Sequence, residues 1–528
     1  MRYECDVLII GGGITSALVA QKLIELKPNL KVIVTEAGKR LFDFENRFEY
    51  RQRNLDYGEN MWPGDIVADQ GGRGIVSRTM AVGGSALHFG GVCSRFSEED
   101  TRLKSMYGLY VDWPLDWKGD LEKFYGEAER RIGVSGEPGP LPEDWRSDPF
   151  PMPAMTMSYN LKQLKSWAEK SGIPFWTTPQ AKNTVDNYGG RGKCRRCNTC
   201  EVCPTGARYS PDFTFKQLLD AKKIELHDQT LIRRLVLDDR STKIAAATGA
   251  KEDGSDDNVE YRAKTFVLAA GYCWSAHLLL LSANSRFPNG LANSSDHVGR
   301  YMTGHLAYST QIDLDLKIYP GMNEQHSLIS RQFFRCAPDK PYVRHDLRVW
   351  ESGSGRNPRL RDAAGNLLLG DALLADWRTR TSRGSARVRS YYEVQPDKDS
   401  RLTLDPANKN RWGDPLPTIV HKIDAASQAR AGATRDHIQN VFAQLAKAND
   451  GKMGGNLQAL GYQDHPAGGC RMGHDPATSV VDSHGRTHDH ENLWVAGSPT
   501  LPSGGCTNGT LTFIAVALRS TAEIAKIV

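Results

Sequence analysis

The first 36 residues constrain the fold most strongly, because they read as a strand, a glycine-rich turn, a helix and a second strand. Residues Val7–Ile10 are uniformly apolar, which is typical of a strand buried in a parallel sheet. The turn Gly11–Ser16 leads into a helix with apolar residues at helical spacing, and a second strand, Lys31–Thr35, ends at Glu36. This order predicts a βαβ unit and therefore an α/β fold.

The turn and the acid have the spacing of a dinucleotide site. Gly11 allows a tight turn, and Gly13 lets the backbone approach a pyrophosphate at the helix N-terminus. Ser16 replaces the usual third glycine and is small enough for close packing of helix against strand. Glu36 lies 25 positions after Gly11, near the offset expected for a carboxylate that accepts ribose hydroxyls. A plain βαβ unit with a flexible turn is the alternative, but the acid favours a dinucleotide.

Four cysteines stand three residues apart and are followed by a proline. They are Cys194, Cys197, Cys200 and Cys203. The run differs by one residue, in the last gap, from the bacterial iron–sulfur pattern. A continuous repeat favours an iron–sulfur cluster, 4Fe–4S or 3Fe–4S, because structural zinc sites usually separate two cysteine pairs by a longer loop. Zinc, disulfides and free thiols remain as alternatives.

The length of 528 residues predicts at least two domains. A net charge of +5 is slight for this length and does not indicate nucleic-acid binding. No apolar run approaches the ~18 residues that a membrane span needs, and no signal peptide is visible. We therefore expect a cytoplasmic protein, with periplasmic export on the signal of a partner as the alternative.

Hydrophobic periodicity predicts further elements. We expect helices at 120–132, 211–222, 276–281, 426–448 and 511–527, and strands at 265–271, 388–394, 401–404 and 492–496. Two double glycines, Gly83-Gly84 and Gly90-Gly91, indicate backbone pressed against a ligand.

Together these motifs resemble the glucose–methanol–choline (GMC) flavoprotein oxidoreductases. The match is spread over the whole chain and includes the family's FAD-binding turn, its loop along the flavin and its C-terminal catalytic block. The segments that carry it are Gly11–Ser16 with Glu36–Gly38, Arg78–Gly91, Asp112–Leu115, Val267–Gly271, His465–Gly473, Asn492–Ser498 and Asn508–Thr512.

The resemblance implies a fold and its division into domains. The fold class is α/β (α+β overall), with a Rossmann-like FAD-binding domain and an inserted, sheet-based substrate domain. We expect the FAD-binding domain at 1–305 plus 456–528, with a cysteine-rich insertion at about 186–210, and the substrate domain at 306–455.

The resemblance also implies the FAD contacts. They are Gly11, Gly13, Ser16, Glu36, Gly83, Gly84, Ser85, His88, Ala270, Gly497 and Asn508. The chain is most similar to pyranose oxidases and to the catalytic subunits of FAD-dependent sugar dehydrogenases. In pyranose oxidases a histidine at the position of His88 is bonded to the flavin, so covalent and non-covalent FAD are both open. The sugar dehydrogenases carry an iron–sulfur segment ending like Cys203–Ala207.

Alcohol oxidation needs a base for the hydroxyl proton and an acceptor for the hydride. His465 is the predicted base, because a neutral imidazole has a pKa near the working pH. By resemblance, Asn508 is its partner and hydrogen-bonds the same substrate hydroxyl.

The sequence therefore predicts an FAD-dependent dehydrogenase that oxidises an alcohol group of a sugar, glycoside or polyol. Because a cluster passes single electrons, we expect a one-electron acceptor, a cytochrome or a ferredoxin, together with a small accessory subunit. One alternative is a flavin oxidase that makes hydrogen peroxide and holds a structural zinc or thiol loop. Another is an electron-transfer flavoprotein subunit without a substrate of its own.

Overall fold

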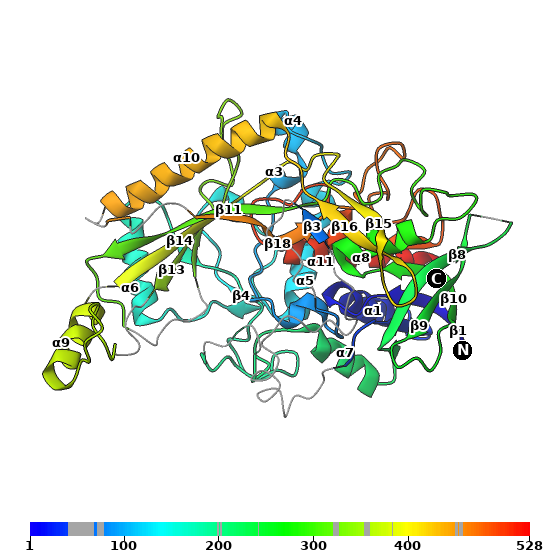
Figure 1. Cartoon of the computed structure of the whole chain (residues 1–528), viewed down its shortest axis with the longest axis horizontal. Helices are drawn as coiled ribbons and strands as arrows, with labels where there is room; N and C mark the ends of the chain where they lie inside the picture. The colour runs from blue at the N-terminus through cyan, green and yellow to red at the C-terminus, as the bar shows by residue number, and fades with distance from the viewer. Residues whose placement is uncertain are drawn as a thin grey trace.

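Two large sheets organise the chain (Figure 1). The computed structural model describes residues 1–40, 68–70, 79–197, 200, 203–240, 242–319, 327–352, 359–382, 384–448, 452–453 and 458–528. Arg78, the first residue of the predicted flavin loop, lies outside them. Among the described residues, no helix is both long and apolar enough to cross a bilayer.

The first sheet has the strand order β7-β2-β1-β10-β9-β8, and β19 also pairs with β10. Strand β1 is parallel to β2 and to β10, so Val7 pairs with both Val32 and Thr265. The carboxyl ends of these three strands therefore meet at one edge, where ligands bind in such sheets. The strands are β1 (Arg2–Ile10), β2 (Val32–Thr35), β7 (Glu225–His227), β8 (Thr230–Leu237), β9 (Ile244–Lys251), β10 (Val259–Leu268) and β19 (Leu493–Val495).

Helices pack around this sheet and close its core. Helix α1 contacts both α7 and α11, and α11 contacts α5. The five helices are α1 (Ile14–Leu26), α5 (Glu122–Ile132), α7 (Pro211–Asp220), α8 (Gly271–Leu281) and α11 (Thr510–Ile527). The helices predicted in these regions are confirmed, although α8 begins five residues earlier than its apolar pattern indicated.

The second sheet is antiparallel, with the order β17-β11-β14-β13-β12-β6 and with β18 paired to β11. Its core is shared with α6 (Tyr159–Glu169) and α10 (Ala425–Lys447), and α10 lies along β11 and β14 in Figure 1. The strands are β6 (Trp176–Thr177), β11 (Thr303–Leu314), β12 (Leu328–Ser330), β13 (Leu347–Ser352), β14 (Gly384–Tyr392), β17 (Lys452–Met453) and β18 (Gln458–Ala467).

A smaller sheet joins β15 (Arg401–Lys409), β16 (Pro415–Val420) and β3 (Ala68–Gln70). The remaining short elements are η1 (Gly84–Leu87), α3 (Glu98–Thr101), α4 (Leu103–Tyr107), η2 (Trp117–Leu121), η3 (Pro142–Asp144), η5 (Ser498–Thr500) and the two-stranded sheet β4 (Ser135–Gly136) with β5 (Met152–Pro153).

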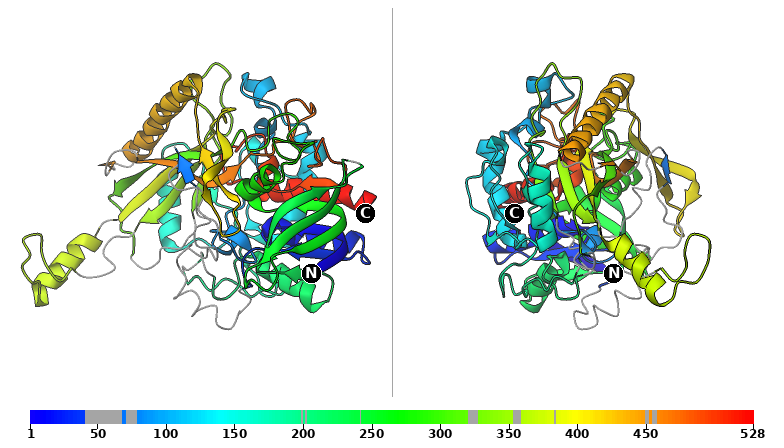
Figure 2. Two further views of the ribbon diagram at one scale, coloured as in Figure 1. Left: turned by 45° about the vertical axis from the view of Figure 1, so that its right-hand side comes forward. Right: turned by 90° about the vertical axis from the view of Figure 1, so that its left-hand side faces the viewer.

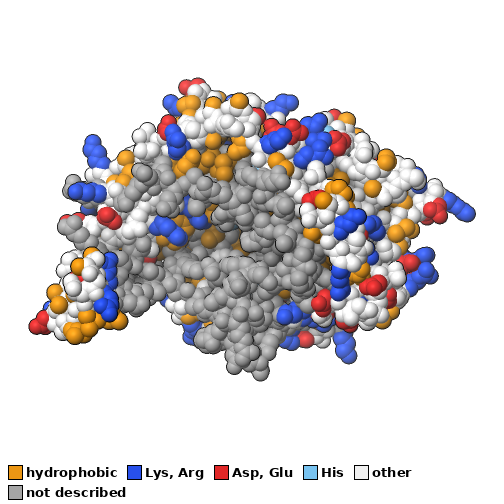
Figure 3. Space-filling model, viewed as in Figure 1, with side chains coloured by type: hydrophobic (Ala, Val, Ile, Leu, Met, Phe, Trp, Pro, Cys, Tyr) orange, Lys and Arg blue, Asp and Glu red, His pale blue; other side chains and the backbone are white. Residues whose placement is uncertain are grey.

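Helix α9 (Gly370–Thr381) stands away from the rest of the molecule (Figure 2). Apolar and charged side chains lie side by side along it (Figure 3), and Leu374 and Trp377 are 44% and 36% exposed. The sequence did not single out this helix.

The strands expected at 265–271, 388–394, 401–404 and 492–496 and the helix at 426–448 are present. The division into 1–305 plus 456–528 and 306–455 stays a prediction. The second sheet also takes strands from outside 306–455, since β6 and β18 belong to it.

Candidate active site

A cavity of about 1060 Å³ lies between the carboxyl edge of the first sheet and one face of the second. This volume suits a cofactor together with a small substrate. Eleven of the twelve residues predicted to bind FAD or to act in catalysis line it, namely Gly11, Gly13, Glu36, Gly83, Gly84, Ser85, His88, Ala270, His465, Gly497 and Asn508. Ser16 does not line the cavity but is fully buried in the first turn of α1, as its packing role requires.

The glycine-rich turn explains two of these positions. Gly11 has a φ of +104°, and a Cβ there would lie 2.6 Å from the carbonyl oxygen of Ala269, so only glycine fits between β1 and β10. Gly13 is the N-cap of α1, and a Cβ there would meet no protein atom. No side chain caps the helix at this end. Its backbone N–H groups and partial positive charge therefore face the cavity, which is the arrangement that binds phosphate.

The Glu36 carboxylate is held at the other end of the turn. Its oxygens accept hydrogen bonds from the backbone N–H groups of Gly12 at 2.6 Å and Gly38 at 2.9 Å. Burial nevertheless raises the pKa of Glu36 to about 7. An acceptor fixed at this place fits the ribose hydroxyls of a dinucleotide.

The double glycine at Gly83-Gly84 allows its segment to lie against the glycine-rich turn at Gly11–Ser16. The Gly83 N–H donates to the carbonyl of Gly12 at 2.7 Å, and the φ angles of Gly83 and Gly84 are +118° and +55°. The segment then forms η1 and ends at His88, whose N–H donates to the carbonyl of Ser85 at 3.1 Å. His88 is 8% exposed and lines the cavity.

Arg208, which the sequence did not single out, ties this loop to the cysteine segment. Its guanidinium donates to the carbonyls of Ala86 at 2.9 Å and Leu87 at 2.6 Å. Its backbone N–H donates to Sγ of Cys203 at 3.4 Å. Because Arg208 is 1% exposed, these contacts form a rigid connection between η1 and Cys203.

A β-bulge directs His465 into the cavity. Between the pairs Thr303–Ala467 and His305–Asp464, strand β18 contains one more residue than β11. His465 lies in this bulge with a φ of +57°, a left-handed conformation that is uncommon outside glycine and that occurs at functional sites. Its ring lies 5.0 Å from that of His305 and 5.6 Å from that of Tyr391, centroid to centroid.

Asn508 connects His465 to a buried arginine. Its Nδ2 lies 2.6 Å from Nε2 of His465, and its Oδ1 accepts a hydrogen bond from Arg348. The guanidinium fixes which end of the amide is the oxygen, so the NH2 group points at the imidazole. Nε2 is thereby held as an acceptor. Arg348 is itself paired with Asp346 at 2.8 Å, and both side chains are almost fully buried.

The last helix adds a favourable field to this site. Helix α11 begins at Thr510 with Gly509 as its N-cap, directly after Asn508. Thr510 and Phe513 both line the cavity, so the positive end of the helix faces it. Such an end stabilises negative charge that develops in the cavity.

The four cysteines lie outside this cavity, and none of the chain's ten cysteines forms a disulfide. Burial raises the pKa of Cys203, but the N–H of Arg208, the hydroxyl of Thr205 and the charge of Arg208 outweigh it and lower the pKa below its usual value. Burial raises the pKa of Cys194. Within the part of the chain that the structure describes, no three His, Cys, Asp or Glu side chains form a metal-binding group, so these thiols as placed do not fit a cluster.

Comparison with known proteins identifies relatives along the whole chain. Residues 179–307 and 396–517 match two sequence models of the family described as GMC oxidoreductase. The chain is 30% identical over 556 residues to the fructose dehydrogenase large subunit of Gluconobacter japonicus, covering 98% of this chain and 97% of that protein. It is 29% identical over 539 residues to paromamine 6'-oxidase of Streptomyces fradiae, covering 98% and 91%.

Solved structures agree on the fold. The R554K variant of formate oxidase from Aspergillus oryzae superposes with a TM-score of 0.68 at 15% identity, covering 100% of this chain and 98% of that one. Pyridoxine 4-oxidase from Mesorbium loti gives a TM-score of 0.64 at 17% identity, covering 98% and 99%. The expected α/β fold class is therefore confirmed.

Proposed function

Because the chain belongs to the GMC oxidoreductase family, we propose that it oxidises an alcohol group of a sugar, glycoside or related polyol. The family makes it an FAD-dependent oxidoreductase acting on CH–OH groups. The observation that carries the proposal is the hydrogen bond between His465 and Asn508 in a cavity that also holds the dinucleotide turn. The named relatives support the substrate class, since one is a fructose dehydrogenase and another a paromamine oxidase.

The cavity fits FAD. The open side of Gly13 and the amino end of α1 would hold the pyrophosphate, and Glu36 would accept the ribose hydroxyls. When bound, FAD supplies the hydride acceptor for alcohol oxidation.

The protein's own groups handle the proton. When substrate binds, its hydroxyl replaces the direct contact between Asn508 and His465. Nε2 of His465 then accepts the hydroxyl proton, and the Asn508 amide donates to the hydroxyl oxygen. Arg348 keeps that amide from rotating. The amino end of α11 stabilises negative charge beside the pair.

The test is anaerobic mixing of the holoenzyme with a panel of sugars, glycosides and polyols while flavin absorbance is followed. Bleaching by one class supports the proposal. If no alcohol bleaches the flavin, the chain is an electron-transfer subunit without its own substrate. Stoichiometric oxygen uptake with hydrogen peroxide formation would instead identify an oxidase.

We also propose that Cys194, Cys197, Cys200 and Cys203 bind a 4Fe–4S or 3Fe–4S cluster. The spacing of the thiols supports this, and hydrogen bonds to Cys203 that lower the pKa of its thiol agree with it. Their described positions do not form such a site, so the proposal rests on ligand type and spacing. Iron and acid-labile sulfide per flavin, measured on anaerobically purified protein, test it. Zinc without sulfide would leave the structural-zinc alternative.

A cluster carries one electron at a time, so its presence would match a one-electron acceptor such as a cytochrome or a ferredoxin. The relative named as a large subunit supports a small accessory subunit as well. Reduction of a purified cytochrome by substrate plus enzyme, compared with oxygen as acceptor, tests this part.

Finally, we propose that His88, which is buried and lines the cavity, lies against the flavin, and one alternative is that the two are covalently bonded. The other is a histidine that only packs against the flavin. Denaturation followed by filtration decides between them, because a covalent flavin stays with the protein.

A further inference from the structure

One wall of the cavity is built from arginine and aromatic side chains on β13 and β14. These strands are antiparallel neighbours (Figure 1). Arg348 lies opposite Arg389, and Trp350 lies opposite Arg387. All four side chains line the cavity. The residues between them alternate to the other face, where Val349 and Val388 are fully buried in the core shared with α10.

Two guanidinium groups stack on a single indole in this wall. The Cζ atoms of Arg387 and Arg389 lie 4.9 Å and 4.8 Å from the centre of the Trp350 ring. Arg389 also lies 4.3 Å from the ring of Tyr391. Stacking fixes the plane of a guanidinium and leaves its edge of N–H donors for a ligand.

The charges on this wall are not balanced evenly. Asp346 is paired with Arg348 and also attracts Arg389. Arg387 forms no ion pair with any carboxylate among the described residues, and its pKa is lowered by burial and by the positive charge of Arg389. Glu351 also lines the cavity and is 8% exposed. An anion held between Arg387 and Arg389 would relieve their mutual repulsion.

The wall begins beside the catalytic pair. The Tyr391 ring lies 5.6 Å from that of His465, and Arg389 and Arg387 follow on the same face of β14. Two residues of a strand span about 7 Å, so Arg389 lies about 7 Å and Arg387 about 13 Å beyond Tyr391 along the strand.

Building on the proposed function, we infer that the substrate carries a carboxylate and that Arg387 and Arg389, stacked on Trp350, bind it. The substrate class is thus an acidic carbohydrate, a sugar acid or a glycoside of one. Its reacting hydroxyl lies at His465 while its carboxylate accepts paired N–H bonds from a guanidinium. A phosphate or sulfate ester presents the same anionic oxygens, and the experiment separates these sources.

The kinetic test uses the holoenzyme and substrate pairs that differ only in charge. These are methyl glucoside with methyl glucuronoside, glucitol with gluconate, and glucose with glucose 6-phosphate and glucose 6-sulfate. In the wild type we expect kcat/KM for the carboxylate member to exceed that of the neutral member by about 10- to 100-fold. In Arg387→Gln this ratio falls toward one.

Arg411→Gln is the matched control, because Arg411 also stacks on a tryptophan, Trp412 at 4.1 Å, but does not line the cavity. It should leave the ratio unchanged. Preference for the phosphate or sulfate ester over the carboxylate would overturn the carboxylate assignment. A neutral preference in the wild type, or an equal loss for both members in Arg387→Gln, would overturn the anion subsite.

Binding is measured separately, so that inactivity does not hide the result. Glucuronate and glucose are titrated into oxidised holoenzyme while the flavin spectrum and the heat of binding are followed. Tighter binding of glucuronate that weakens with salt and is lost in Arg387→Gln supports the inference even if nothing is turned over. Equal binding overturns it. Failure of every alcohol to bleach the flavin affects only the proposed function.

Discussion

The Nδ2 atom of Asn508 lies 2.6 Å from Nε2 of His465, and this contact joins the residues just before α11 to the bulge in β18. A further interaction orients each of these two side chains. Arg348 holds the Asn508 amide, and the left-handed backbone at His465 sets the direction of the imidazole. The acceptor nitrogen is therefore preorganised before substrate arrives, which lowers the cost of reaching a reactive geometry.

Replacing His465 by Ala should slow flavin reduction by about 100- to 10,000-fold, because the hydroxyl proton loses its acceptor. Stopped-flow absorbance under anaerobic conditions measures this rate. His474→Ala is the control, since His474 is exposed and does not line the cavity. If His465→Ala keeps a wild-type rate, another group takes the proton.

Arg348→Lys should keep a positive charge near Asp346 but lose the fork that orients the Asn508 amide. We expect the rate of flavin reduction to fall by about tenfold or more and the pH profile of kcat/KM to shift, since Nε2 of His465 is no longer held as an acceptor. A structural role alone would lower stability without moving the pH profile. The pH profile and the thermal midpoint together distinguish these results.

Gly11→Ala and Gly13→Ala should reduce FAD content for different reasons. A Cβ at Gly11 collides with the backbone of Ala269, so this variant should lose folded yield and FAD together. A Cβ at Gly13 points into open space, so this variant should fold but bind FAD weakly. Circular dichroism and the flavin content of the purified proteins check both. Full FAD occupancy in Gly13→Ala would show that the pyrophosphate lies elsewhere.

FAD affinity should depend on pH through Glu36. Without ligand, the pKa of Glu36 is raised to about 7, so below that pH the carboxyl is mostly protonated. Ionising this buried carboxyl costs folding free energy, so the stability of the folded protein falls as the pH rises from about 4.5 to 7. Ribose hydroxyls donate to the ionised form. The dissociation constant of FAD should therefore fall as pH rises toward 7 and then level off.

This dependence is measured by titrating apoprotein with FAD between pH 5.5 and 8, in a His88→Ala background that excludes a covalent bond. Glu36→Gln should flatten the curve, because the amide does not titrate. The same slope with and without Glu36 would assign the pH effect to another group.

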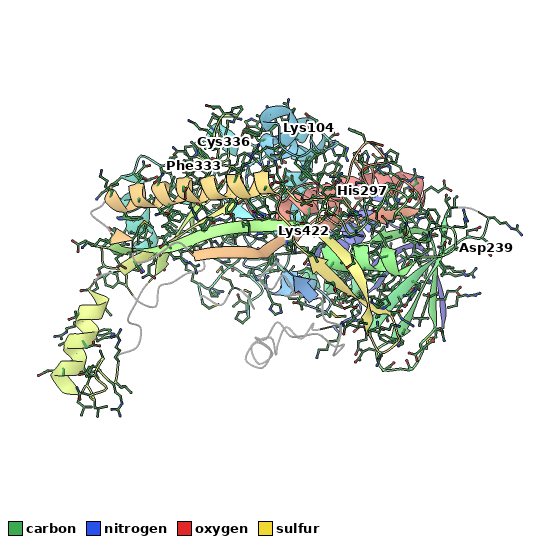
Figure 4. All side chains as sticks on the ribbon, turned by 45° about the horizontal axis from the view of Figure 1, so that its top comes forward. Lys104, Asp239, His297, Phe333, Cys336 and Lys422 are labelled. Carbon is green, nitrogen blue, oxygen red and sulfur yellow. The ribbon has the colours of Figure 1, made fainter. Side chains whose placement is uncertain are left out.

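Acid should destabilise the second sheet through His345. Figure 4 labels Phe333, whose ring stacks on that of His345 at 4.7 Å. Burial lowers the pKa of His345 to about 3, and its side chain is fully buried. Because the folded state binds the proton less readily than the unfolded state, stability present above pH 6.5 is lost as the pH falls.

The loss approaches about 5 kcal/mol near pH 3, and about 2 to 3 kcal/mol is expected between pH 6.5 and 4.5. Urea unfolding of wild type and His345→Phe at both pH values measures it, as the variant lacks this titration. A wild-type protein no more acid-sensitive than the variant would contradict the prediction.

Local motifs made much of the cavity predictable. The spacing of Gly11, Gly13 and Glu36 depends on a single βαβ unit, so neighbouring residues determine it. His465 and Asn508 could be named because short motifs surround them. The helix that follows Asn508 was predicted from its periodicity, whereas β18, the strand that carries His465, was not.

Arg348 and Arg208 were not predictable in the same way. The strand Leu347–Ser352 was not predicted, and the face on which Arg348 lies depends on its pairing with Arg389 of β14, 41 positions later in the sequence. Arg208 acts through carbonyls of η1, about 120 residues earlier. Contacts of this kind follow from tertiary packing and have no local sequence signal.

For the cysteine run, the sequence predicts the chemistry of the ligands but not the geometry of the site. Its spacing identifies the type of ligand that Cys194 and Cys203 could provide, because thiolates repeated at three-residue intervals suit a soft metal. Spacing does not determine how the loop folds, since the same order of residue types is compatible with more than one backbone path.

The chain's first and last helices, α1 and α11, pack against each other, and the cavity needs Gly11 and Asn508 at once. During synthesis the dinucleotide turn emerges about 500 residues before its partner. The cavity is therefore complete only after both segments have been synthesised and have packed together. A chain whose synthesis stops before Thr510 contains β1 and the glycine-rich turn but lacks α11. Its cavity is incomplete, and cellular proteases would degrade it as an incompletely folded protein.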